Sequence, residues 1–177
     1  DLPIKTFVEF GVANYRESTT RFLMMNNNWS GYVMDGSDSN IAEIRSSEYY
    51  WRYDLTAEQL FITKDNINEA LASIHFAPEV GILHIDLDVN DYWIWKEISE
   101  IQPAVCIVEF NSRFGAERPI TIPYDERFVR SKAHYSNLYY GASLSAFDHL
   151  ARQKGFSFIG CNSAGVNADR KSTRLNS

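Results

Sequence analysis

The alternation of two hydrophobic periodicities along nearly the whole chain is the feature that most constrains its fold. Apolar runs with strand character alternate with segments whose apolar residues recur every three to four positions. The predicted strands cover residues 6–10, 31–34, 59–63, 81–85, 104–110 and 156–161. Repeated strand, helix, strand units of this length predict an α/β fold, with a doubly wound, mostly parallel Rossmann-like sheet.

Helices fill most of the gaps between these strands. They are predicted at residues 67–74, 91–98 and 142–154, and the first of them has Asn66 and Glu69 at capping-box spacing. Another helix is predicted to begin near Glu17 and to turn Phe22 and Leu23 toward the core.

Length and charge narrow the class of protein. A chain of 177 residues forms one domain, and 23 acidic against 17 basic residues give a net charge of −6. This charge disfavours nucleic acid and anionic membranes as partners. No apolar run reaches the ~20 residues of a membrane span, and no signal peptide is visible. We therefore predict a cytoplasmic protein, with Cys106 and Cys161 both buried and reduced.

Ligands of doubly wound folds bind at the carboxyl ends of the strands. Gly11 follows the first strand, where a glycine allows the backbone to approach a ligand. Ala13 and Arg16 interrupt the G-x-G-x-x-G pattern, which disfavours a nicotinamide or flavin dinucleotide. Asp35 follows the second strand and is placed to bind ribose hydroxyls, although an Asp before Gly also forms turns.

Acidic residues gather after the fourth strand. His84 precedes Asp86 and Asp88, and period-two spacing puts these two carboxylates on one side of an extended chain. Together with Glu109 and Asn111 after the fifth strand, Asp86 would offer oxygen ligands to a hard divalent ion. A helix cap beside a solvated loop is the competing interpretation.

In order, F-V-E-F-G-V-A-N, the Asp35 turn, Asp65-Asn66, H-I-D-L-D and V-E-F-N resemble the class I S-adenosylmethionine-dependent methyltransferase superfamily, particularly its bacterial FkbM-like members. The resemblance implies that the first loop holds the methionine moiety and that the second carboxylate holds the ribose. Asp65 and Asn66 would flank the adenine, unless they only cap a helix. The implied cofactor-binding residues are Glu9, Gly11, Asn14, Asp35, Gly36, Ser37, Asp65 and Asn66.

Metal-dependent O-methyltransferases of this superfamily suggest a further set. Asp86, Glu109 and Asn111 resemble their magnesium ligands, although Glu-Phe-Asn replaces an adjacent Asp-Asn pair. Asp86 is then a catalytic residue through the metal, and Asp88, Asp91 or His84 is the base without one. The expected reaction is methyl transfer to O or N of a small acceptor. The alternative is a non-catalytic nucleotide-binding or assembly module of the same fold.

A long irregular segment, residues 111–140, is expected to select the acceptor. Its basic and aromatic side chains could grip an anionic group and stack on a ring, although solvated arginines and packed tyrosines are the commoner case. They are Arg113, Arg118, Arg127, Arg130, Tyr124, Tyr139 and Tyr140.

The last residues do not fit the superfamily. Its fold ends with a strand inserted antiparallel between strands five and six, and residues 165–168 resemble the approach to it. The polar end R-K-S-T-R-L-N-S looks like translated sequencing-adapter DNA. We therefore predict a domain of residues 1–168 in a fragment that has also lost residues before Asp1, a non-native tail at 169–177 and no final strand. Unpaired strand edges would then make the product aggregation-prone.

Overall fold

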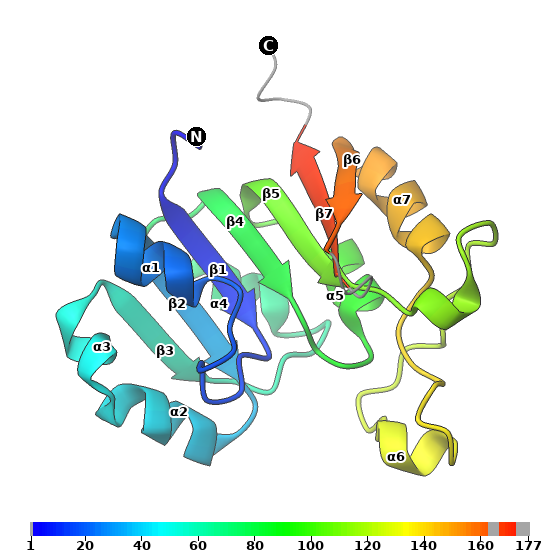
Figure 1. The fold of residues 1–177 in the computed structure, drawn as a ribbon, viewed down its shortest axis with the longest axis horizontal. Coiled ribbons are helices and arrows are strands. Elements are labelled where there is room, and N and C mark those ends of the chain that lie inside the picture. Colours follow the sequence, from blue (N-terminus) through cyan, green and yellow to red (C-terminus); the bar gives the residue numbers. More distant parts are fainter. Residues whose placement is uncertain (1, 163–166, 173–177) are drawn as a thin grey trace.

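A computed structural model describes residues 2–162 and 167–172 and confirms the predicted α/β class. In these ranges a seven-stranded sheet has the order β3-β2-β1-β4-β5-β7-β6 (Figure 1). The strands are β1 (Thr6–Phe10), β2 (Ser30–Asp35), β3 (Leu55–Gln59), β4 (Glu79–Ile85), β5 (Gln102–Glu109), β6 (Phe156–Cys161) and β7 (Asn167–Ser172). All neighbouring pairs are parallel except those of β7, which runs antiparallel to both β5 and β6.

Helices cover both faces of this sheet (Figure 1). They are α1 (Arg21–Asn27), α2 (Asp38–Ser46), α3 (Glu48–Arg52), α4 (Ile67–Ala72), α5 (Asp91–Glu97), α6 (Arg130–Ala133) and α7 (Leu144–Gln153). Alternate residues of β1 separate the two cores, as period-two geometry requires. Phe7 packs with Met24 of α1 and Ile41 of α2, whereas Val8 belongs to the core under α4, α5 and α7.

The prediction that the final strand is missing is wrong. Residues 167–172 form β7, and its register pairs Ala168 with Val108 on one side and with Cys161 on the other. Strand pairing uses main-chain hydrogen bonds, so polar side chains do not prevent it. The inner edges of β5 and β6 are therefore paired, which removes the reason for expecting aggregation. Residues 165 and 166 lie outside the described ranges, and the non-native origin of the tail stays a prediction.

Two element boundaries differ from the sequence prediction. β3 spans Leu55–Gln59 rather than residues 59–63, because Leu55 and Ala57 are the buried members of an edge strand. The helix predicted near Glu17 begins at Arg21, and Phe22 is 66% exposed instead of facing the core. Met24 is the buried residue of that helix, while Leu23 is half-buried.

Cys106 is buried in β5, as expected, but Cys161, the last residue of β6, is exposed. None of the helices in the described ranges has the length and apolar character needed to cross a bilayer.

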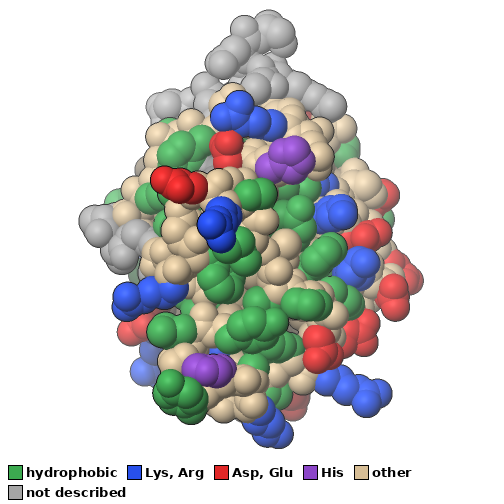
Figure 2. All heavy atoms as spheres, turned by 90° about the vertical axis from the view of Figure 1, so that its right-hand side faces the viewer, with side chains coloured by type: hydrophobic (Ala, Val, Ile, Leu, Met, Phe, Trp, Pro, Cys, Tyr) green, Lys and Arg blue, Asp and Glu red, His purple; other side chains and the backbone are tan. Residues whose placement is uncertain are grey.

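The segment from η1 (Ser112–Phe114) to α7 runs along one end of the sheet and is tied down by side-chain hydrogen bonds. Trp93 Nε1 donates to the carbonyl of Ile122 at 2.8 Å, and Asn90 Nδ2 donates to that of Asp125 at 3.0 Å. Figure 2 shows hydrophobic side chains on the face formed by this segment and α7. The segment is therefore an anchored wall of the molecule, and its outer surface carries hydrophobic side chains among polar and charged ones.

Trp95 and Trp51 provide a matched test of where the core lies. Trp95 is 1% exposed and its ring contacts those of Phe147 and Phe156, whereas Trp51 is 75% exposed. We expect Trp95→Ala to lower the free energy of unfolding by about 3–5 kcal/mol. Trp51→Ala should change it by less than about 0.5 kcal/mol. Urea denaturation, monitored by circular dichroism, measures the free energy of unfolding of both variants. Equal decreases in the two variants would contradict the assignment of the core.

Candidate functional site

The turn after β1 is held against the end of β4 by Gly11. Its φ is +70°, and a Cβ at this position would lie 1.7 Å from the carbonyl oxygen of Asp86. Its own N–H donates to the carbonyl of Met34 at 2.9 Å. Only glycine fits here, because a side chain would collide with backbone that cannot rotate away. The ends of β1, β2 and β4 are thereby drawn together.

Asp35 joins two of these strand ends through its carboxylate. It accepts hydrogen bonds from the backbone N–H of Ala13 at 2.8 Å and of Ser37 at 2.9 Å, and from Asn40 Nδ2 at 2.9 Å. The side chain is thus a brace between the β1 turn and the start of α2. Ser37 caps α2, since its hydroxyl accepts the N–H of Asn40.

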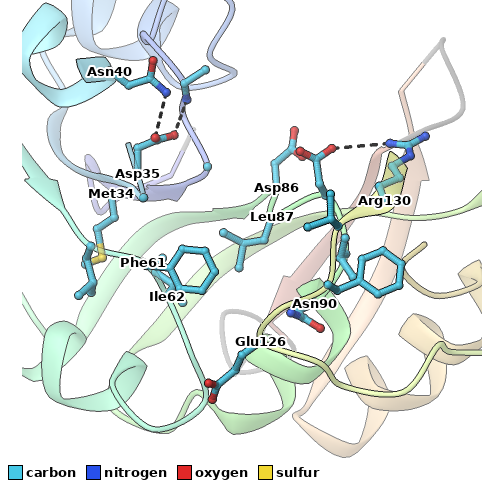
Figure 3. A pocket seen from close by; sticks show the side chains of 18 residues that line it. Met34, Asp35, Asn40, Phe61, Ile62, Asp86, Leu87, Asn90, Glu126 and Arg130 are labelled. Atoms are coloured by element: carbon cyan, nitrogen blue, oxygen red, sulfur yellow. Dashed lines mark hydrogen bonds and ion pairs between the residues drawn. The ribbon is translucent and has the colours of Figure 1, made fainter. Parts of the chain in front are cut away.

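A hollow of about 650 Å³, here called the main hollow, opens at the carboxyl ends of the strands. Figure 3 shows Asp35 and Asn40 on one side of it, Arg130 on the other and Asp86 between them. Its remaining walls come from three segments. These are Leu60, Phe61 and Ile62 after β3, residues 86–90 after β4, and Glu126 with residues 128–130 of the long segment.

A second hollow of about 400 Å³ adjoins the first and is lined by Glu9, Asn14, Ser18 and His84. Gly11, Ala13 and Asp86 border both hollows. Glu9 and Asp35 therefore face neighbouring spaces that meet at Gly11, rather than one undivided cavity. The two hollows therefore lie next to each other at the β1 turn and share three lining residues.

Glu9 is buried and held by several donors. Its carboxylate accepts hydrogen bonds from the hydroxyls of Ser18 and Thr20 and lies 2.7 Å from His84 Nδ1. Burial acts to raise the pKa of Glu9, but the hydrogen bond and charge of His84 outweigh it and lower the pKa below its ordinary value. His84, predicted as a catalytic base, is instead 3% exposed and bound to this carboxylate. It positions Glu9 at the second hollow.

The carboxyl groups of Asp86, Asp91 and Glu109 lie within 4.8 Å of one another. Burial, and then the charges of Asp86 and Asp88, raise the pKa of Glu109 to about 7. Burial also raises the pKa of Asp86, and it raises that of Asp91 well above the usual range although Asp91 accepts the N–H of Leu87 at 2.9 Å. Because these acidic groups lie so close together, the negative charge of one disfavours ionisation of the others.

The predicted metal set is not assembled, because Asn111 is committed elsewhere. This buried side chain donates from Nδ2 to the carbonyls of Leu138 and Tyr140, and its Oδ1 accepts the N–H of Arg113. Asn111 thus anchors the long segment. Asp91, rather than Asn111, lies beside Asp86 and Glu109. The sequence did not indicate this, because a helix cap explained the position of Asp91 equally well.

Asp88 is also placed differently from a buried catalytic base. Its side chain is 78% exposed, its φ is +62°, and it lies 3.6 Å from Arg130 Nη1. It belongs to the rim of the main hollow, which its ion pair with Arg130 helps to close.

Asp65 and Asn66 do not line the main hollow. Asn66 closes a turn by accepting the N–H of Thr63 and donating to the carbonyl of Phe61. Leu60, Phe61 and Ile62 occupy the position expected of Asp65 and Asn66, because β3 ends four residues earlier than predicted. Phe61 is 60% exposed and lines the main hollow, which makes it a candidate binding residue that the sequence prediction missed.

Of the residues proposed for acceptor selection, only Arg130 lines the main hollow. Tyr124 lies at its edge, where its hydroxyl accepts the N–H of Lys64 at 3.1 Å. Tyr140 is buried beneath the guanidinium of Arg130.

No protein-family model and no curated protein sequence matches the chain. Solved structures do resemble it. The Methanococcus jannaschii fibrillarin pre-rRNA processing protein has a TM-score of 0.58 at 10% identity, over 97% of this chain and 69% of that one. An O-methyltransferase family protein from Burkholderia thailandensis has a TM-score of 0.58 at 9% identity, over 95% of this chain and 50% of that one.

The N-terminal domain of EvdMO1, solved in the presence of SAH and D-fucose, has a TM-score of 0.53 at 9% identity, over 94% of this chain and 73% of that one. Identities this low bear on the fold alone. The fold is that of S-adenosylmethionine-dependent methyltransferases, as the sequence resemblance implies.

Replacing Gly11 tests the contact at the centre of the site. Gly11→Ala should lower the free energy of unfolding by about 3 kcal/mol or more, because the new Cβ meets the Asp86 carbonyl and φ is positive. Gly141→Ala is the control, since its φ is also positive but its Cβ would meet nothing within 4 Å. Thermal denaturation that affects both variants equally would refute the contact.

The raised pKa of Glu109 predicts a pH dependence of stability. The folded chain holds this proton up to about pH 7, whereas an unfolded Glu109 releases it near pH 4.5, so stability falls as pH rises between these values. We expect Glu109→Gln to remove about 2 kcal/mol of that decline. The exposed Glu117→Gln is the control. Urea midpoints between pH 4.5 and 8 that decline equally in both variants would count against a buried, protonated Glu109.

Proposed function

We propose that the chain binds S-adenosylmethionine and transfers its methyl group to an oxygen or nitrogen of a small acceptor. The observation that carries this proposal is the pair of adjoining hollows that share Gly11, with Asp35 and Phe61 in one and Glu9 in the other. In a doubly wound fold this edge of the sheet is where nucleotides bind. The fold shared with methyltransferases supports the same assignment.

The residues that line the two hollows fit the parts of S-adenosylmethionine. Asp35 and Gly36 lie where an adenosyl ribose would bind, and the exposed ring of Phe61 offers a surface for stacking on the adenine. The second hollow, between Asn14 and Glu9, is polar and would hold the amino-acid portion. S-adenosylmethionine supplies a methyl group on a positively charged sulfur, so the protein mainly aligns it with the acceptor.

Asp86 is the residue best placed to take the acceptor's proton. It borders both hollows, and none of the described residues donates a hydrogen bond to its carboxylate. Its raised pKa makes it a stronger base than an ordinary aspartate. The acceptor's O–H or N–H proton passes to Asp86 and then to water, while the carbon–sulfur bond breaks and the new bond to carbon forms. S-adenosylhomocysteine is the other product.

The sequence hypothesis also included a magnesium ion bound by Asp86, Glu109 and Asn111. The predicted set does not fit, because the amide of Asn111 is used in hydrogen bonds, and we route no step through a metal. The chain is titrated with S-adenosylmethionine in about 5 mM magnesium chloride and, separately, in EDTA. The two dissociation constants are then compared. Equal affinity is expected.

Two exposed phenylalanines test the donor site. Phe61→Ala should weaken binding of S-adenosylhomocysteine about fivefold to tenfold, because an aromatic stacking contact is lost. Phe22 on α1 is similarly exposed and lies away from both hollows, so Phe22→Ala should bind as the parent does. Isothermal titration calorimetry measures the three dissociation constants. Absence of binding in the parent chain would overturn the proposed function.

A non-catalytic binding module is the second candidate. It is favoured by Asp35, whose carboxylate already accepts three hydrogen bonds from the protein. Binding of S-adenosylhomocysteine without methyl transfer to any small amine or alcohol would support this alternative.

A further inference from the structure

We infer that the acceptor is a small amine, bound as its ammonium ion, rather than an anion. This inference rests on the proposed function and concerns the acceptor side, defined here as the part of the main hollow lined by Asp86, Asp88, Asn90, Glu126, Phe128 and Arg130. From the sequence, an anionic acceptor was one option, because the arginines of the long segment could grip a carboxylate or phosphate. The structure places one of those arginines in the main hollow.

The acceptor side is lined by three carboxylates and one guanidinium. Asp86, Asp88 and Glu126 belong to it, with Glu109 close behind Asp86. Walls with an excess of one charge attract ligands of the other sign and repel those of the same sign. Two of these carboxylates, those of Asp86 and Glu126, are not paired with Arg130.

Arg130 is already engaged on three sides. Nη1 lies 3.6 Å from the Asp88 carboxylate, the guanidinium carbon lies 3.6 Å from the centre of the Tyr140 ring, and Nε donates to the carbonyl of Asn137 at 2.7 Å. An anionic ligand would have to share this guanidinium with the Asp88 carboxylate, which repels it. Arg130 therefore closes the rim, and the charge of Asp88 reduces its attraction for a carboxylate or phosphate.

Asp86 is the group that an ammonium ion would reach. Figure 3 shows it in the middle of the main hollow, between the Asp35 side and Arg130. No described residue donates a hydrogen bond to its carboxylate, which can therefore accept from a ligand that carries N–H donors. A primary ammonium group has three such donors and a full positive charge, which matches an unpaired carboxylate.

The apolar part of the acceptor side indicates what the amine is attached to. Leu87, Phe128 and Val129 line the same space, next to Phe61. A hydrocarbon or aromatic body can pack there while the nitrogen faces Asp86. Before transfer the ammonium gives one proton to Asp86. The neutral nitrogen then forms its bond to the methyl carbon as the carbon–sulfur bond breaks.

Three ligands of one shape and different charge test this inference. Phenethylamine, phenethyl alcohol and phenylacetate are titrated into the full 177-residue chain at pH 7.5, with and without saturating S-adenosylhomocysteine. We expect the amine to bind at least about tenfold more tightly than phenylacetate, with the alcohol between them. Equal affinities, or tighter binding of phenylacetate, would overturn the inference.

Substitutions assign the preference to the acceptor side. Glu126→Gln should weaken amine binding about threefold and leave alcohol binding unchanged, whereas the exposed Glu69→Gln on α4 should affect neither. Arg130→Gln should strengthen amine binding, because it removes the one cation and releases Asp88. If Arg130→Gln instead abolishes binding of phenylacetate, the arginine binds anions and the inference fails.

The same titrations separate this inference from the proposed function. Failure of S-adenosylhomocysteine to bind, with the amine preference intact, would reject the methyl donor and keep the cation site. Binding of S-adenosylhomocysteine without an amine preference would do the reverse. Loss of radiolabelled methyl transfer to phenethylamine in Asp86→Asn, with S-adenosylhomocysteine affinity retained, is the result expected if both are correct.

Discussion

The close approach of Gly11 to the main chain of Asp86 is the constraint on which the rest of the site depends. It brings the turn after β1 onto the end of β4 so tightly that no side chain fits between them. Because this contact is backbone against backbone, it fixes the border shared by the two hollows. Asp35 secures the other side of the same turn by accepting the N–H of Ala13. A single glycine and one carboxylate thus hold this turn in place.

Periodicity was enough to predict the class of fold and the limits of two of its strands. β1 and β6 begin and end at the predicted residues, because each is bounded by clear changes of pattern. The edge strand β3 was displaced by four residues, since only Leu55 and Ala57 are buried there and the apolar run after them is loop. β7 was missed because its residues are polar, and its pairing through the main chain leaves no hydrophobic signature.

The site was predictable as a set of strand ends but not as a set of roles. Gly11, Asp35 and Asp86 were found because each lies at the end of a strand or directly after it, and topology brings such positions together. Which partner each side chain chooses depends on packing that spacing does not encode. Asn111 turned toward the carbonyls of the long segment, His84 toward Glu9, and Asp91 toward Glu109. The displacement of β3 also hid Phe61, the residue that replaced Asp65 and Asn66.

Asp86 borders both hollows, and this shared border has a kinetic consequence. In the proposed reaction, the sulfonium of the methyl donor and the ammonium of the acceptor would compete for the Asp86 carboxylate. The ligand that binds first would therefore weaken the attraction of Asp86 for the second. Once the sulfur has lost its charge, that competition ends. The sequence in which substrates arrive and products depart would then be governed by one side chain at the meeting point of two compartments.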